Sequence, residues 1–377
     1  MNQKTELALL AVAVALSLWT HSLVLKEFYM PTYGNTGIHA APIREFVETG
    51  AYSKEDHFSY GGGIPSTYVP FYRIGVAAFV MLAGVSVEAS SRLWVMIVGA
   101  LLPLGFYLLG RKVFGSQAGL FAAFFSALPV DLLVYTVRPL PQALAMALIP
   151  IALYLVLERK WLASIALTFF VVMTHQESAL YLVAVQFGLA ALVFAERAWL
   201  FACKKSGDGE AVERKQVAML AFACWGAGVA SYFGWHFIVT GHTDFLSMNQ
   251  FVLHEGTAVE LNDVLSQLGT LLPWLAAAGA LVLAARAVKG VLRAGELLAA
   301  SAVIAGVILV KNDLIGLNVL MQRFIAFLDQ GIVLLAAIGA AWVVASLERE
   351  MLQSVLKAGK EFVEKALHAL GSRPGAH

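Results

Sequence analysis

The sequence predicts an all-α integral membrane protein with about ten transmembrane helices. Its composition, its series of long apolar runs and the uneven placement of its cations support this fold class. Of the 377 residues, 59% are hydrophobic and 14% are charged, which is typical of multi-span membrane proteins. The net charge of +1 provides no basic surface for a phosphate backbone, so we expect no nucleic-acid partner.

An apolar run of about 17 to 25 residues is long enough to cross the hydrocarbon core of a bilayer. The first run follows only one cation, Lys4, and lacks a small-residue cleavage site, so it is predicted to be retained as a helix. Cys203 and Cys224 are too few for a disulfide framework or a four-ligand zinc site. The predicted spans are 7–25, 92–110, 117–136, 140–157, 161–174, 178–195, 216–239, 266–286, 295–311 and 330–347.

The distribution of cations predicts the orientation of these spans. They place 18 of the 26 Lys and Arg residues on one side, which the positive-inside rule assigns to the cytoplasm. We therefore expect a multi-pass plasma-membrane protein with both termini cytoplasmic. In a rival arrangement the run 74–87 also spans and 21 cations lie inside, so charge alone does not exclude it. That run is short and follows Arg73, which favours a helix in the outer interface with Arg73 reaching lipid phosphate.

Two long loops lie on the predicted outer side, the first at 26–91 and the second at 241–263. Long loops commonly carry function. In the first, the stretch PIREFVETG predicts a short amphipathic helix that stops at Gly50, so this loop holds two juxtamembrane helices. Residues 1–347 are thus predicted to form the transmembrane domain, and 348–377 a cytoplasmic amphipathic tail.

The sequence IPSTYVPFYRIGVAAFVMLAGVS, followed by SSRLWVMIVGALLPLGFYLLGRKVFG, resembles the start of the GT-C superfamily of membrane glycosyltransferases. The positions that carry the resemblance are His39, Tyr68 with Pro70, Arg92, and the segment 110–115. Members of this superfamily use polyprenyl-phosphate-linked sugars. The resemblance implies that a sugar is transferred from such a lipid to an acceptor on the outer face of the membrane.

Asn35 departs from the family pattern, because the family places an acidic residue four positions before His39. An amide accepts no proton at neutral pH and is a weak metal ligand. The sequence therefore leaves open a catalytically inactive relative that serves as a lipid-binding or assembly scaffold among partner membrane subunits. A transporter is disfavoured, since the charges cluster at the ends of the spans.

Asp131 is the best candidate to replace the missing carboxylate, because a carboxylate within an apolar run tends to face a cavity or a partner. With His39 and Asn35 it forms the candidate catalytic set. The other outer acids are interpreted as solvated surface groups; they are Glu45, Glu48, Asp56 and Glu177.

The resemblance implies that Arg323 holds the donor phosphate, a task that suits a planar guanidinium. The remaining candidates for substrate binding are Arg92, Arg138, His175 and Tyr68. A divalent metal ion is chemically feasible, although no local spacing favours it and its ligands stay unassigned. The side chains available to it are His39, His57, His175, Glu177 and Asp131.

Overall fold

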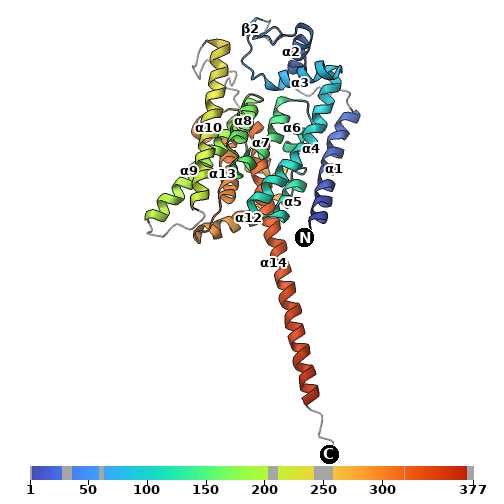
Figure 1. Ribbon diagram of the computed structural model, residues 1–377, viewed down its shortest axis with the longest axis vertical. Helices are drawn as coiled ribbons and strands as arrows, with labels where there is room; N and C mark the ends of the chain where they lie inside the picture. Colours follow the sequence, from blue (N-terminus) through green and yellow to red (C-terminus); the bar gives the residue numbers. More distant parts are fainter. Residues whose placement is uncertain are drawn as a thin grey trace, which may run out of the picture.

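The computed structural model describes residues 2–27, 36–58, 63–202, 211–241, 258–317 and 319–371. Over these ranges the chain is a helical bundle with one short antiparallel pair of strands, β1 (Glu55–Asp56) and β2 (Ile64–Pro65), in which Glu55 lies opposite Pro65. Figure 1 shows the bundle and a long helix that projects from one end of it.

The helices follow the predicted apolar runs. Those of the first half of the chain are α1 (Gln3–Glu27), α2 (Thr36–Thr49), α3 (Phe71–Ala83), α4 (Val87–Phe114), α5 (Ser116–Phe125), α6 (Val130–Thr136), α7 (Pro141–Leu157) and α8 (Trp161–Val172). Those of the second half are α9 (Gln176–Ala202), α10 (Ala211–Thr240), α11 (Leu261–Leu268), α12 (Leu271–Val288), α13 (Ala294–Val310), a 3₁₀ turn η1 (Asn312–Ile315) and α14 (Met321–Gly371).

The predicted count of ten spans is not confirmed. Six helices in the described ranges are long and apolar enough to cross a membrane, or seven if α5 and α6 together make one span. The predicted span 117–136 is in fact broken, because α5 and α6 meet at an angle of 72°. Pro129, which has no amide hydrogen, immediately precedes α6 and favours this break. The other apolar helices are shorter, namely α3, α7, α8 and α13.

Helices α2 and α3 form a cap over one end of the bundle, which we call the cap end (Figure 1). The predicted stop at Gly50 is confirmed, since α2 ends at Thr49 and Gly50 has a φ of 71°. Helix α3 has 13 residues and stops at Gly84, whose φ is 65°. In Figure 1 it lies across the end of the bundle beside α2, as expected for an interface helix.

Specific contacts fix the cap to the bundle. Arg44 of α2 forms an ion pair with Glu88 at the start of α4. The backbone N–H of Phe71 donates to the carbonyl of Met173, 2.9 Å away, and so ties the start of α3 to the link between α8 and α9. The side chain of Ile43 is 1% exposed. The cap is therefore packed on the bundle and positions its side chains over the helix ends beneath.

The start of α1 and the projecting part of α14 lie at the end away from the cap, which we call the opposite end (Figure 1). The predicted boundary at residue 347 is not a helix boundary, because α14 runs without a break to Gly371. The stretch 340–371 contains no proline and is rich in helix-forming residues, so nothing in it ends the helix. That the tail faces the cytoplasm stays a prediction.

The segment 110–115, which carries part of the sequence resemblance, is a tight corner at the opposite end. Gly115 has a φ of 99°, which favours glycine and lets α5 fold back along α4. A Cβ at Gly110 would lie 2.9 Å from the Cβ of Ala122, and one at Gly119 would lie 2.8 Å from the Cβ of Arg111. These glycines therefore set the close packing of the two helices.

Candidate functional site

Four separate segments bring polar side chains together beneath the cap. His39 comes from α2, Tyr68 from the segment before α3, His175 from the link between α8 and α9, and Arg323 from the first turn of α14. Arg73 of α3 and Glu177 of α9 join them. We call these six residues the cap-end cluster. The sequence placed His39 and His175 on one side of the membrane, and the structure places both in this one cluster.

Arg73 organises the cap side of the cluster. Its side chain is 2% exposed, so the predicted contact of Arg73 with lipid phosphate is wrong. The face of α3 that carries Arg73 is packed inside the protein. Its Nε donates to Nδ1 of His39 at 3.4 Å and its Nη1 donates to Ser66 Oγ at 3.3 Å. Its guanidinium also lies over the ring of Tyr68, 5.0 Å from the centroid.

These contacts define the state of His39. Its Nδ1 accepts from Arg73, so Nε2 carries the ring proton. Burial, the charge of Arg73 and the neighbouring His175 together hold the pKa of His39 well below its ordinary value. His39 is therefore a neutral hydrogen-bond donor at neutral pH and a poor general base.

Tyr68 links the two histidines. Its ring packs edge-on against His39, with centroids 4.8 Å apart, and lies 6.5 Å from the ring of His175. Burial, followed by the charge of Glu177, raises the pKa of the Tyr68 hydroxyl, so this group stays protonated.

Glu177 connects His175 to Arg323 in a buried relay. The Nε2 atom of His175 lies 2.7 Å from Glu177 Oε2, and Arg323 Nη1 lies 3.0 Å from Glu177 Oε1. Because Nδ1 of His175 accepts from the backbone N–H of Ser178 at 3.2 Å, Nε2 carries the ring proton and faces Glu177. The prediction that Glu177 is a solvated surface acid is wrong, since the residue is 6% exposed.

Arg323 remains accessible although it is held by Glu177. Its side chain is 39% exposed, whereas that of Glu177 is 8% exposed. The carboxylate therefore fixes the guanidinium from below and leaves much of the planar fork open to a ligand.

Asp131 and Arg138 lie in α6 and just after it. Asp131 is partly buried in the first turn of α6. The guanidinium of Arg138 lies 5.5 Å from the ring centroid of Tyr135 in the same helix. The roles of these two residues at the donor site stay predictions.

Two further candidates are not part of the cap-end cluster as described. Arg92 lies near the start of α4 and is partly buried, and its role in phosphate binding stays a prediction. Asn35 lies outside the described residues.

The donor set expected for a metal ion does not assemble in the described part of the chain. No group of three or more His, Cys, Asp or Glu side chains there is arranged to hold an ion. His57 instead lies at the surface, with its Nε2 3.5 Å from Glu45 Oε1. His175 and Glu177 supply only one adjacent pair of ligand types.

Sequence reasoning missed the importance of Arg73 and Glu177. Arg73 stands at the start of an apolar run that is too short to cross a membrane. Such a run indicates a helix that packs on the end of the bundle, and an arginine on its packed face is then buried. Glu177 follows His175 at the start of a span, a position where a carboxylate needs a partner.

Comparison with solved structures shows that the fold of this chain is similar to that of an archaeal membrane protein. The apo oligosaccharyltransferase of Archaeoglobus fulgidus has a TM-score of 0.64 and 17% identity, over 94% of this chain and 52% of that chain. The same archaeal enzyme, AglB, in complex with an inhibitory peptide and a dolichol-phosphate has a TM-score of 0.59 and 17% identity, over 99% of this chain and 52% of that chain.

A third structure, the A. fulgidus oligosaccharyltransferase with Zn and sulfate, has a TM-score of 0.57 and 18% identity, over 93% of this chain and 51% of that chain. The chain therefore spans about half the length of the structures it matches. No family model and no curated protein matches the chain. At this level of identity the likeness is one of fold alone.

Proposed function

We propose that the chain transfers a sugar from a polyprenyl-phosphate-linked donor to an acceptor at the cap end. The observation that carries this proposal is the exposed Arg323 guanidinium, fixed by buried Glu177 beside His175. The fold adds support, since the similar archaeal enzyme was solved with a dolichol-phosphate.

Arg323 would bind the donor phosphate. A guanidinium presents a planar set of donors that matches phosphate oxygens, and its contacts with an ionised group are about twice as strong as neutral hydrogen bonds. Glu177 and His175 would hold the guanidinium in place, and Arg138 would contribute a second positive charge. Arg73 and Tyr68 would act as positioning residues that fix the cap above the donor.

Asp131 would activate the acceptor. In the proposed step an acceptor oxygen or nitrogen forms a bond to the anomeric carbon while the bond from that carbon to the phosphate oxygen breaks. Asp131 takes the acceptor proton, and the polyprenyl phosphate leaves as an anion that Arg323 stabilises. His39 would donate a hydrogen bond, because its low pKa makes it a weak base. Asn35 would likewise offer hydrogen bonds and no base.

No step is assigned to a divalent ion, because the described residues do not supply three ligands for one.

A non-catalytic lipid-binding or assembly subunit is the second candidate function. Asn35 favours it, since the family carboxylate is replaced there by an amide. On this alternative the cap-end cluster binds the lipid phosphate but transfers no sugar.

The test uses the purified full chain in nanodiscs with a labelled polyprenyl-phosphate sugar. Arg323→Gln should weaken donor binding by about 10- to 100-fold, the loss expected for a charge-assisted contact. Lys54→Gln is the control, because Lys54 is an exposed cation of the segment between α2 and α3 and lies outside the cap-end cluster.

The outcomes separate the two functions. Donor binding followed by transfer supports the enzyme, and donor binding without transfer to any acceptor supports the scaffold. Equal donor binding by Arg323→Gln and Lys54→Gln would contradict both forms of the proposed lipid site.

A further inference from the structure

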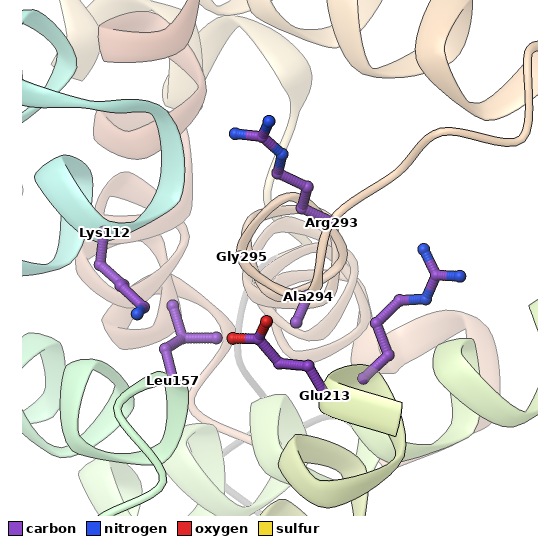
Figure 2. A pocket seen from close by; sticks show the side chains of 7 residues that line it. Lys112, Leu157, Glu213, Arg293, Ala294 and Gly295 are labelled. Atoms are coloured by element: carbon purple, nitrogen blue, oxygen red, sulfur yellow. The ribbon is translucent and has the colours of Figure 1, made fainter. Parts of the chain in front are cut away.

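A second polar site lies at the opposite end of the bundle, where four helix ends meet. A cavity of about 250 Å³ opens there between the ends of α4 and α7 and the starts of α10 and α13. Its lining residues are Lys112, Leu157, Glu213, Arg214, Arg293, Ala294 and Gly295 (Figure 2). None of them belongs to the cap-end cluster.

The cations of this cavity are held in place by partners. Arg214 is 2% exposed, its Nη1 donates to the carbonyl of Leu292 at 2.7 Å, and its Nε lies 3.6 Å from Glu196 Oε2. Lys112 Nζ lies 2.8 Å from Glu158 Oε1, and its side chain is 34% exposed. The cavity is therefore a formed site with fixed charges.

One wall of the cavity is backbone. A Cβ at Gly295 would lie 2.9 Å from the Cα of Val113, so the start of α13 packs directly against α4. The carboxylate of Glu296 caps the same helix by accepting from the N–H of Arg293 at 2.8 Å, and Arg286 Nε lies 2.7 Å from it. These contacts keep the wall rigid.

The cavity lies at the ends of two helices that are long enough to cross a membrane. Lys112 is in the last turn of α4, and Glu213 is in the first turn of α10. The ends of membrane-spanning helices lie at the interface with water. Basic pockets between such helices are known to bind phospholipid headgroups.

The charges of the site balance. Three cations line the cavity, and three carboxylates accompany them: Glu213 in the lining, with Glu158 and Glu196 as ion-pair partners. In Figure 2 the ammonium of Lys112 and the carboxylate of Glu213 both point toward Leu157, while the guanidinium of Arg293 points away from Leu157. The cavity thus presents both signs of charge.

We propose that this cavity binds the headgroup of a phospholipid that carries both a phosphate and an ammonium group. The cations would contact the phosphate oxygens, and Glu213 would contact the ammonium. The carboxylate of Glu213 would repel a purely anionic headgroup. A neutral headgroup would form no charged contact with Arg214. This proposal does not depend on the proposed transfer of sugar.

The test measures lipid binding to the full chain in detergent by native mass spectrometry. Phosphatidylethanolamine should bind more tightly than phosphatidylglycerol, diacylglycerol or inorganic phosphate. The double variant Lys112→Gln, Arg293→Gln should lower the affinity for phosphatidylethanolamine about tenfold or more. Lys215→Gln should leave it unchanged, because Lys215 is an exposed cation of the same helix end that does not line the cavity.

The variant Glu213→Gln tests the ammonium contact separately. It should remove the preference for phosphatidylethanolamine over phosphatidylglycerol while the phosphate contacts remain. If the double variant fails to fold, Lys112→Gln alone provides the same comparison with Lys215→Gln.

Three results would overturn the proposal. They are equal binding of diacylglycerol and phosphatidylethanolamine, equal losses in the Lys112 and Lys215 variants, and binding of inorganic phosphate as tight as that of the lipid.

Discussion

Arg73 at the cap end and Arg214 at the opposite end are both 2% exposed, yet their surroundings differ. In the described part of the chain Arg73 contacts neutral partners, namely His39, Ser66 and the face of Tyr68. Arg214 instead contacts the Leu292 carbonyl and the carboxylate of Glu196. Burying a cation away from an opposite charge costs several kcal/mol or more. The cap end therefore holds a positive charge that its own cluster does not offset.

The two ends are therefore suited to different ligands. The cap-end cluster has two arginines and one carboxylate, so an anion such as a lipid phosphate completes it. At the opposite end the cations and carboxylates balance, which suits a headgroup with both charges.

The largest effect is expected from Asp131→Asn, which would remove the proposed base from the cap end. Sugar transfer should fall by about 10²- to 10⁴-fold, the usual contribution of a general base, with donor binding retained. Single-turnover transfer and donor affinity are measured together. Asp56→Asn is the control, because Asp56 lies in β1 and is not a member of the cap-end cluster. Full activity of Asp131→Asn would show that another group activates the acceptor.

A direct comparison of the two buried arginines should give the next largest effect. Arg214→Met removes a buried cation together with its contacts to Glu196 and the Leu292 carbonyl, and should cost about 3 to 5 kcal/mol of stability. Arg73→Met leaves only neutral acceptors and should cost about 1 to 3 kcal/mol.

Chemical unfolding of the two variants in the same detergent measures this order. Donor binding should fall in Arg73→Met but not in Arg214→Met, because only Arg73 belongs to the cap-end cluster. The reverse order of stability would mean that the charge of Arg73 is offset by a carboxylate after all.

The smallest expected effect is a pH dependence from His39. Its pKa in the folded chain lies well below its unfolded value of about 6.5, so the unfolded state binds more protons in acid. The contribution of neutral His39 to the free energy of unfolding is complete above about pH 6.5. It falls as the pH drops below that value, by up to about 1.4 kcal/mol per pH unit.

Unfolding at pH 7 and pH 5 measures this change, and His39→Asn should flatten it. The control is His57→Asn, since His57 is a half-exposed histidine of the same loop. An equal flattening by the two variants would place the acid sensitivity outside the cap-end cluster.

Parts of the fold follow from local patterns in the sequence. Gly50 and Gly115 end or turn helices, because both have positive φ angles. The apolar runs predict where helices lie, because backbone groups in lipid must be hydrogen-bonded within their own segment. The count of spans did not follow from hydropathy, because the run 117–136 is mostly apolar and yet is broken by a 72° bend next to Pro129.

The site was predictable only in part. His39, Tyr68, His175 and Arg323 were recognised as polar groups of the outer loops, and the structure brings them together. The roles of Arg73 and Glu177 were misread, because an interfacial charge and a buried charge look alike in a sequence.

By itself, the sequence determined that this chain is a multi-helix membrane protein with its polar groups near the helix ends, because hydropathy and cation placement are local properties. The tertiary structure alone decided which charges are buried and which partners they have. The cap-end cluster joins residues from His39 to Arg323, and the opposite cavity joins four helix ends. Such contacts depend on the packing of distant segments, which no local pattern encodes.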